Sequence, residues 1–504
     1  MPPVATEPEP TPSDERRPSF APFTSRAGIA VCTVLALAFA AERSRALAPL
    51  SLLRAPTAAE TPKHTQLEPP AAIGEARLTS ETKTRSELSQ PDSAELRAAA
   101  ANLRAAAADQ QAGDVALPTI DAQEPPLPLA DASGKALDGF FRALTATAHK
   151  QPHAITRIAH FGDSIVVSDL VSGTLRRKLQ SEFGDAGHGF MLVANAWPAY
   201  FHNDVTRFAT AGWSVSRIVG PYAEDGLYGL GGVSFKAERN TLARFGTAKT
   251  GDFGKAVSHF VLDYLEDPNG GTIQVSVDGA PKALVDTRGS TKKSAYFSVD
   301  VADGEHEFEI YTKSGVTRAF GVVLERDLPG IVLDALGVQG ARIRFLDKQD
   351  DAHWAEQLVW RKPDLLIYEF GANESGDGFL YSMADYHRTM KDVLAQGQRA
   401  LPGSSCLVIG AMDRAAKSGD EIVSLRVIPA IVAEQRSTAA ELGCAFFDTY
   451  TAMGGAHSMP TWVRRGLGQA DMTHPTAIGS EVIGNWVFRA LMKSYNEHLK
   501  QAPR

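Results

Sequence analysis

Two stretches of this 504-residue chain alternate short apolar runs with amphipathic segments, and a long stretch with a different pattern separates them. The apolar runs lie at 155–161, 331–336, 364–370, 406–409 and 444–447, and the segments with helical periodicity lie at 137–148, 170–183, 353–360, 386–394, 422–442 and 478–495. Near-continuous apolar runs are typical of parallel strands that are buried on both faces. The alternation therefore predicts a doubly wound α/β layer around a parallel five-stranded sheet.

The stretch between these two parts has the pattern of antiparallel strands. Its apolar residues recur at every second position, as in Ile273, Val275 and Val277, and turn signals such as Asp278-Gly279 separate the runs. This pattern predicts an all-β jelly-roll or sandwich domain that is inserted into the α/β domain. We assign the first part of the α/β domain to 133–194, the inserted domain to 195–327 and the second part to 328–504.

The N-terminal quarter predicts export. Residues 1–26 are rich in Pro, Glu and Ser, and we expect them to be disordered as a cytoplasmic tail or an n-region. Residues 27–41 are uncharged and mostly apolar but shorter than the ~20 residues that span a bilayer. We interpret 27–48 as a signal peptide or a membrane-retained signal anchor, and 49–132 as an Ala/Pro-rich spacer. Both alternatives place the rest of the chain in the cell envelope, either periplasmic or anchored to the inner membrane and facing outward.

Charge and cysteine content exclude several classes of protein. The net charge of −8, without a basic stripe, does not favour nucleic-acid binding. Three cysteines without a CxxC motif are too few for a disulfide scaffold or a structural zinc site. We favour two buried free thiols at Cys406 and Cys444, and a single bond between neighbouring strands is the alternative in an oxidising compartment.

Residues suited to acyl transfer follow the predicted strands. Because ligands of open α/β sheets bind outside the carboxyl ends of the strands, we expect these residues to lie at one edge of the sheet. They are Ser164 after the first run, Gly340 after the second, Asn373 after the third, and Asp471 and His474 before the last helix.

Each of these residue types has a part in a serine-hydrolase mechanism. Ser164 is the candidate nucleophile, His474 its base, and Asp471 the acid that orients the imidazole. The backbone N–H groups of Ser164 and Gly340 and the side-chain amide of Asn373 are candidate donors to an oxyanion. Gly337 is the alternative to Gly340, which we prefer because it leaves room for a turn after the strand.

Four motifs resemble the blocks of the SGNH (GDSL) hydrolase superfamily. They are GDS at 162–164, the glycine at 340, GAN at 371–373 and DMTH at 471–474, with GDSI in place of the common GDSL. This resemblance implies an SGNH, flavodoxin-like fold and a serine carboxylic-ester hydrolase that needs no metal or organic cofactor. The phrases HFGDS and LRRKLQSEFGDAGHGF, with a β-domain between the serine and glycine blocks, are similar to bacterial peptidoglycan O-acetylesterases, in which a carbohydrate-module-like β-sandwich is inserted at this place.

We therefore expect an exported esterase that removes O-acetyl groups from a cell-wall glycan, with peptidoglycan as the first choice of substrate. The alternatives are an envelope polysaccharide O-acetyltransferase with the same triad, a non-catalytic glycan-binding protein, and a lipase or lysophospholipase. Aromatic residues at the start of the insertion could stack on sugars, although core packing is the favoured interpretation of each one. They are Trp197, Tyr200, Trp213, Tyr222 and Tyr228.

Overall fold

The structure, a computed structural model, describes residues 127–419 and 421–501. The predictions for 1–26 and 27–48, and nearly all of that for 49–132, lie outside the described residues. Within the described part of the chain, none of the helices combines the length and the apolar character needed to cross a bilayer.

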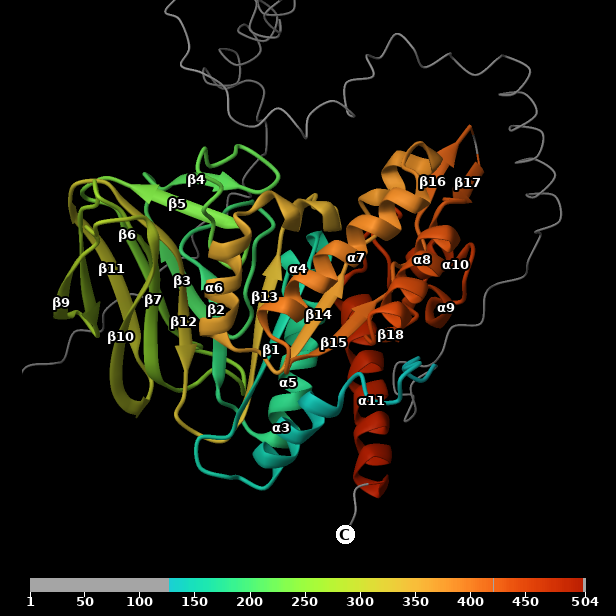
Figure 1. Cartoon of the computed structure of the whole chain (residues 1–504), viewed down its shortest axis with the longest axis horizontal. Coiled ribbons are helices and arrows are strands. Elements are labelled where there is room, and N and C mark those ends of the chain that lie inside the picture. The colour runs from blue at the N-terminus through green and yellow to red at the C-terminus, as the bar shows by residue number, and fades with distance from the viewer. Residues whose placement is uncertain (1–126, 420, 502–504) are drawn as a thin grey trace, which may run out of the picture. The chain divides into compact units, whose positions relative to one another are not determined.

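A parallel sheet of five strands forms the centre of the α/β layer, as predicted, in the order β13-β1-β14-β15-β18 (Figure 1). The strands are β1 (Ile155–Gly162), β13 (Gly330–Gly337), β14 (Leu365–Glu369), β15 (Ser405–Ile409) and β18 (Ala445–Phe447). Both faces of the sheet are buried: Phe161 and Leu366 belong to one apolar cluster, and Ile158 and Ile367 to another. This two-sided burial explains why the strands read as continuous apolar runs.

Helices cover both faces of this sheet. The helices α3 (Asp138–Ala148), α5 (Val171–Phe183) and α11 (Ala477–Gln501) pack together on one face. The helices α6 (Asp351–Arg361), α7 (Met383–Ala400) and α8 (Ile428–Glu441) line the other. The shorter helices are α4 (Ser164–Val167), η2 (Ile343–Lys348), η3 (Glu374–Leu380), α9 (Thr449–Met453) and α10 (Ser458–Arg464).

Two antiparallel sheets form the inserted all-β domain, at the left in Figure 1. One sheet has the order β10-β7-β12-β5-β4, and the other has the order β3-β6-β11-β8-β9. Their strands are β3 (Val205–Ala209), β4 (Ser214–Arg217), β5 (Val233–Ala237), β6 (Leu242–Thr247), β7 (Val257–Glu266), β8 (Thr272–Val277), β9 (Ala280–Asp286), β10 (Lys293–Gly304), β11 (Glu307–Ser314) and β12 (Thr317–Glu325).

One further strand, β2 (Gly187–Leu192), pairs antiparallel with β12 and so extends the first of these sheets. It precedes the start that we assigned to the insertion at residue 195. The strand also packs against β13 of the α/β layer. The predicted domain limits stay a prediction. Because β2 pairs with β12 and packs against β13, it contacts both the inserted domain and the α/β layer.

The helix predicted over 422–442 begins later than expected. A hairpin of β16 (Ala415–Ser418) and β17 (Glu421–Ser424) precedes it, and α8 begins at Ile428. Pro429 lies in the first turn of α8, where its missing N–H costs no hydrogen bond. The apolar pair Ile422-Val423 therefore belongs to strand β17 and not to the helix. A run this short has no clear periodicity from which a strand could be predicted.

Cys406 and Cys444 form a disulfide, with an S–S distance of 2.08 Å. Our preference for two free thiols was wrong. The parallel register that pairs Leu407 with Ala445 brings the preceding residues together, and their Cα atoms lie 4.7 Å apart. This separation is within the range that a disulfide can bridge.

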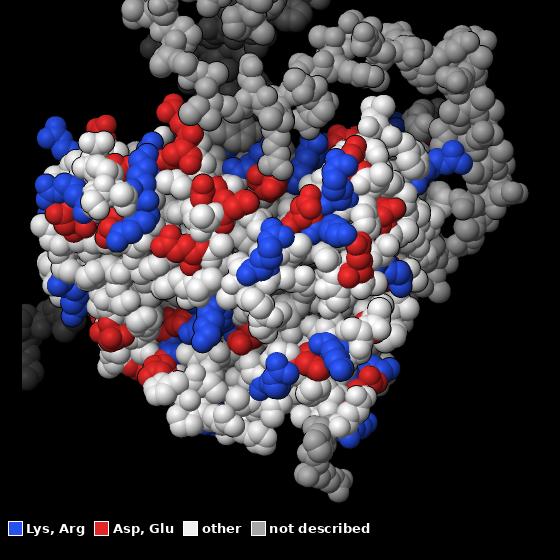
Figure 2. Space-filling model, viewed as in Figure 1, with Lys and Arg blue, Asp and Glu red and all other residues white. Residues whose placement is uncertain are grey.

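Charged side chains of both signs are interspersed over the face of the molecule shown in Figure 2. Several charged side chains of the described chain pair with a neighbour of opposite sign, as in Arg244–Glu309 and Lys292–Asp225, both at 2.7 Å. Exposed pairs of this kind stabilise a protein by less than about 1 kcal/mol, because water and salt screen them.

A buried network of ion pairs joins the inserted domain to the α/β layer. Arg361 of α6 donates two hydrogen bonds to Asp334 of β13, at 2.6 and 2.8 Å, and pairs with Glu325 of β12. Glu325 also accepts two hydrogen bonds from Arg157 of β1, at 3.2 and 2.8 Å. Burial raises the pKa of Glu325, but the charges and hydrogen bonds of Arg361 and Arg157 outweigh burial and lower it to about 2.

Replacing the central cation should destabilise the fold strongly. In Arg361→Met, Asp334 and Glu325 stay buried without their main partner, and we expect a loss of about 3–5 kcal/mol in the free energy of unfolding, measured with urea. The matched control is Arg388→Met, which removes an exposed pair with Asp385 and should cost less than about 1 kcal/mol. Equal losses in the two variants would contradict the assigned role of the network.

Acid should weaken the same network. Because the folded-state pKa of Glu325, about 2, lies below its ordinary value of 4.5, this carboxylate stabilises the fold above pH 4.5. That contribution, roughly 3 kcal/mol, is lost as the pH falls from 4.5 to 2. The unfolding free energies of the wild type and of Glu325→Gln should therefore converge over this range, and a constant difference would refute the assignment.

Candidate active site

Ser164 stands just beyond the carboxyl end of β1, the neighbour of the central strand β14, where α4 begins. Gly162 allows this tight turn, since a Cβ atom there would lie 2.3 Å from a methyl group of Val166 and 2.8 Å from the Glu369 carbonyl oxygen. The Asp163 side chain caps α4 by accepting a 3.0 Å hydrogen bond from the Ile165 N–H. Ser164 is thus the first residue of a short helix at the edge where ligands of such sheets bind.

The structure brings Ser164 together with the two predicted residues near the C-terminus. Ser164 Oγ lies 2.8 Å from His474 Nε2, and His474 Nδ1 lies 2.6 Å from Asp471 Oδ2. With the Nδ1–H donating to Asp471, Nε2 is the nitrogen that accepts the serine proton. Serine, imidazole and carboxylate therefore form one continuous hydrogen-bonded chain, although 310 positions separate Ser164 from His474.

A strained turn positions Asp471 beside His474. Met472 lies between them with φ of +56°, in the left-handed region that a residue with a side chain rarely adopts. This turn lets Asp471 Oδ1 accept the N–H groups of both Thr473 and His474 at 3.0 Å. Burial raises the pKa of Asp471, but the hydrogen bonds from His474 and Thr473 outweigh it and leave that pKa lowered. Asp471 is therefore ionised at neutral pH.

Asn373 connects the serine and glycine loops. Its side-chain amide donates to Asp163 Oδ2 at 3.1 Å and to the Ala341 carbonyl oxygen at 2.9 Å. These acceptors are the immediate neighbours of Ser164 and Gly340. Gly340 itself is exposed, with φ of +78° and open space around its Cα. The alternative, Gly337, has a packing role instead, because a Cβ atom there would lie 2.2 Å from the Val167 nitrogen.

Glu374 supports this arrangement and was missed by the sequence analysis. The carboxylate is buried and accepts the Ile343 N–H at 2.7 Å and the Gly371 N–H at 3.1 Å. It thereby joins the loop after β13 to the loop after β14. The one feature of the sequence that points to a role for Glu374 is its position directly after Asn373. A glutamate at that position is equally typical of a solvated loop.

Arg414 is a second missed residue, in the loop after β15. Its guanidinium donates to Thr473 Oγ1 at 3.0 Å, to the Ala372 carbonyl at 2.6 Å and to Ser375 Oγ at 2.8 Å. These bonds tie the loop that contains Asn373 to the loop that contains His474. Nothing in the sequence around residue 414 distinguishes this arginine from an exposed one.

Asp163, to which the sequence assigns no role in the GDS motif, is buried and accepts hydrogen bonds from the Ile165 N–H and the Asn373 side chain. Burial, followed by the nearby charges of Glu374 and Glu369, raises the pKa of Asp163 to about 8. The carboxyl group is therefore mostly neutral at pH 7, which keeps a full negative charge away from the Ser164 hydroxyl. Within the described ranges, no group of three or more His, Cys, Asp or Glu residues is arranged to hold a metal ion.

Part of the chain matches a known protein family. Residues 303–482 match the model of the GDSL-like Lipase/Acylhydrolase family; this segment includes Gly340, Asn373, Asp471 and His474, whereas Ser164 precedes it. The matched segment is less than half of the chain, and it is similar to a family of lipases and acylhydrolases, which are carboxylic-ester hydrolases. No curated protein sequence matches the chain.

A solved structure shares the fold. A peptidoglycan O-acetylesterase is 21% identical, and the match has a TM-score of 0.63 and covers 73% of this chain and 99% of that one. A family two carbohydrate esterase from Cellvibrio japonicus is 14% identical, with a TM-score of 0.24 and coverage of 58% and 98%. The first similarity spans both the α/β layer and the inserted sheets, which confirms the predicted fold class.

Substituting Glu374 should lower the turnover number more than it changes KM. Glu374→Gln keeps the size of the side chain but replaces one acceptor with an N–H₂ group, so one of the two loops loses its anchor. A misplacement of about 1 Å at a catalytic site can reduce the rate by about 100-fold. We expect kcat for p-nitrophenyl acetate to fall at least about tenfold, whereas Glu434→Gln, on a partly exposed helix surface, should keep wild-type kinetics. An unchanged kcat in Glu374→Gln would show that the loops do not need this carboxylate.

Proposed function

We propose that this protein is an exported serine esterase that removes O-acetyl groups from a cell-wall glycan, with peptidoglycan as the first choice of substrate. The observation that carries the proposal is the hydrogen-bonded chain from Ser164 through His474 to Asp471 at the carboxyl edge of the sheet. This order of groups is the one that activates a serine hydroxyl in acyl transfer.

In the proposed mechanism, His474 Nε2 takes the proton from Ser164 as its oxygen attacks the carbonyl carbon of the acetyl ester. The bond between that carbon and the sugar oxygen then breaks, and His474 returns the proton to the departing sugar hydroxyl. Water attacks the resulting acetyl-serine with His474 again as the base, which releases acetate and restores Ser164. Asp471 holds the imidazole in one orientation and stabilises its protonated form.

The oxyanion of each tetrahedral intermediate would be held by the N–H groups of Ser164 and Gly340 and by the amide of Asn373. The exposed position of Gly340, without a Cβ, supports its assignment, because a ligand can approach that backbone closely. Both amide hydrogens of Asn373 point to protein acceptors in this structure. Asn373 must therefore exchange or share one of these contacts when the oxyanion forms.

Two observations support the substrate class and the compartment. The fold is shared with a peptidoglycan O-acetylesterase over almost the whole length of that protein. The bond between Cys406 and Cys444 fits an oxidising compartment outside the cytoplasm, because thiols in the cytosol are kept reduced. Both agree with the export that residues 27–48 predict.

The decisive experiment measures acetate release from O-acetylated peptidoglycan by the full-length protein and by Ser164→Ala. We expect the substitution to reduce the rate by a factor of at least about 10³, because the nucleophile is lost. The matched control is Ser181→Ala, which removes an exposed hydroxyl on α5 and should leave the rate unchanged. Undiminished release by Ser164→Ala would contradict the proposal.

The same assay separates hydrolysis from acetyl transfer. In hydrolysis the acetyl group appears as free acetate whether or not an acceptor is present. If acetyl groups lost from the donor reappear on an added glycan in preference to water, the protein is an O-acetyltransferase that uses the same serine.

A further inference from the structure

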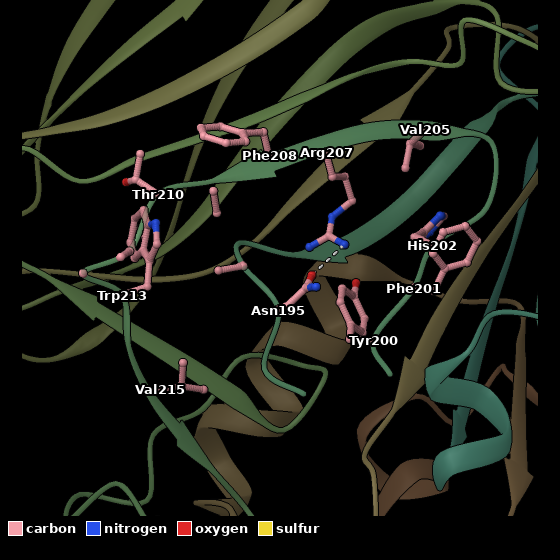
Figure 3. A pocket seen from close by; sticks show the side chains of 14 residues that line it. Asn195, Tyr200, Phe201, His202, Val205, Arg207, Phe208, Thr210, Trp213 and Val215 are labelled. Atoms are coloured by element: carbon pink, nitrogen blue, oxygen red, sulfur yellow. Dashed lines mark hydrogen bonds between the residues drawn. The ribbon is translucent and has the colours of Figure 1, made fainter. Parts of the chain in front are cut away.

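A pocket of about 610 Å³ lies between the loop at 194–202 and the first strands of the inserted domain, β3 and β4 (Figure 3). It adjoins the helix that begins with Ser164. Phe201, which lines the pocket, donates its N–H to the carbonyl of Val167 at 3.2 Å, and Val167 is the last residue of α4. One turn of helix therefore separates this wall of the pocket from the proposed nucleophile.

The side chains that line this pocket favour a negatively charged ligand. None of the 14 lining residues is acidic. Burial lowers the pKa of His202 to about 4, so this ring is neutral at pH 7. Arg207 is then the lining side chain that carries a charge, since an arginine stays protonated in proteins.

Arg207 has no anionic partner in the described part of the chain. Its guanidinium donates to Asn195 Oδ1 at 3.4 Å and to the Leu192 carbonyl at 3.1 Å, and it lies 4.6 Å from the centre of the Tyr200 ring. Its Nε is buried and has no hydrogen-bond partner. Of the five N–H donors of an arginine, three therefore have no partner among the described residues, and one of these three is the buried Nε–H. In Figure 3 the guanidinium projects from β3 into the space between the labelled walls.

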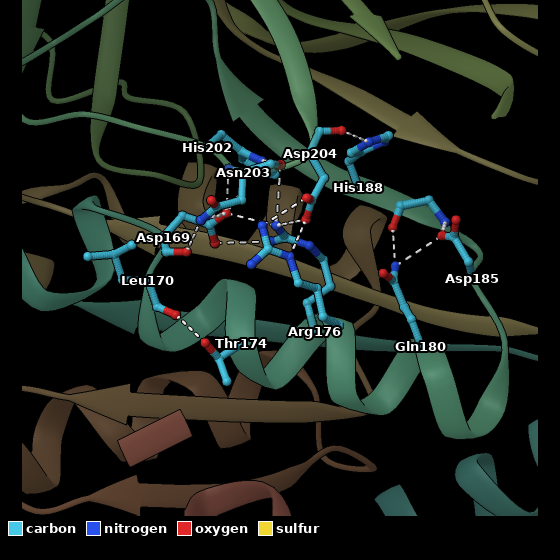
Figure 4. Close-up of polar contacts among 12 residues, drawn as sticks. Asp169, Leu170, Thr174, Arg176, Gln180, Asp185, His188, His202, Asn203 and Asp204 are labelled. Carbon is cyan, nitrogen blue, oxygen red and sulfur yellow. Dashed lines mark hydrogen bonds and ion pairs between the residues drawn. The ribbon is translucent and has the colours of Figure 1, made fainter. Parts of the chain in front are cut away.

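The three arginines that are fully buried in the described part of the chain are each paired with a carboxylate. Arg176 lies between Asp169, at 2.8 Å, and Asp204, at 3.5 Å, as Figure 4 shows. Arg318 pairs with Asp225 at 2.8 Å, and Arg361 pairs with Asp334 at 2.6 Å. Arg207 is partly buried and has no carboxylate beside it in the described chain, so its charge can attract an anion from outside the chain.

Aromatic side chains border the same pocket. Phe201 is 55% exposed, and Trp213 lies on the far wall next to β4 (Figure 3). Apolar rings around a few polar groups are the usual lining of a site for a small organic ligand. A flat ring can cover the apolar face of a sugar, whereas a simple inorganic anion gains nothing from it.

We propose that this pocket is a glycan subsite in which Arg207 binds the carboxylate of a sugar residue next to the acetylated one. The inference rests on the proposed function, because it takes the glycan strand to extend from Ser164 along the loop at 194–202. The guanidinium fork matches the two oxygens of a carboxylate, and Phe201 borders the sugar ring that carries it. Both a lactyl ether and a uronic acid present this group.

Binding of paired monosaccharides to the full-length protein tests the subsite without catalysis. N-acetylmuramic acid differs from N-acetylglucosamine by its lactyl carboxylate, and glucuronic acid differs from glucose by its own. We expect titration calorimetry to show tighter binding of the acid in at least one pair by about 10- to 100-fold, as a charge-assisted hydrogen bond provides. The pair with the larger ratio identifies the source of the carboxylate. Equal binding within both pairs, or no measurable binding of any of the four sugars, would overturn the proposal.

Three variants connect that preference to the guanidinium. Arg207→Gln should reduce the ratio in the preferred pair to about one, and Arg207→Lys should restore part of it, since lysine keeps the charge but lacks the fork. The control is Arg288→Gln, an exposed arginine of the same domain that pairs locally with Asp286 and should keep the wild-type ratio. Melting temperatures verify folding. A wild-type ratio in folded Arg207→Gln would refute the role of Arg207, whereas activity retained in Ser164→Ala would refute the proposed function instead.

Discussion

The buried pairing of Arg361 with Asp334 and Glu325 is the interaction on which the rest of the structure depends. It fastens α6 to β13 and to β12, the last strand of the inserted domain, while Arg157 connects the same glutamate to β1. Two charges of each sign meet where the two domains join. Such a network is costly to desolvate and therefore tolerates few alternative arrangements, which favours a single placement of the inserted domain on the sheet.

The register of the parallel sheet determines where the candidate active site forms. Strand β1 pairs with β13 in a register that sets Gly162 opposite Gly337, and with β14 in a register that sets Gly162 opposite Glu369. The loops that carry Ser164, Gly340 and Asn373 therefore leave the sheet at one edge. Asp163, Glu374 and Arg414 then tie these loops to one another and to the His474 loop by hydrogen bonds. Because the supporting groups are mostly buried, small changes there should act on the geometry of the site.

The inserted domain contributes to the same edge of the molecule. Its strand β2 belongs to one of its sheets yet packs on β13, and the chain that leaves β2 forms the loop beside α4. The unpaired guanidinium of Arg207 faces the pocket that this loop borders. In contrast, exposed charges over the face seen in Figure 2 are mixed in sign, so a specific anion would be recognised inside the pocket and not by the surface as a whole.

The sequence by itself determined the fold class and the positions of the residues brought together at Ser164, because hydrophobic periodicity is local and parallel strands end at a common edge. It did not determine that β2 pairs with β12, that residues 421–424 form a strand, or that Cys406 meets Cys444, since each depends on partners distant in the chain or on tertiary packing. Glu374, Arg414 and Arg207 look alike in the sequence as ordinary charged residues. Only the tertiary structure decided which of them is buried and which has a partner, because burial and pairing are properties of the surroundings and not of the residue.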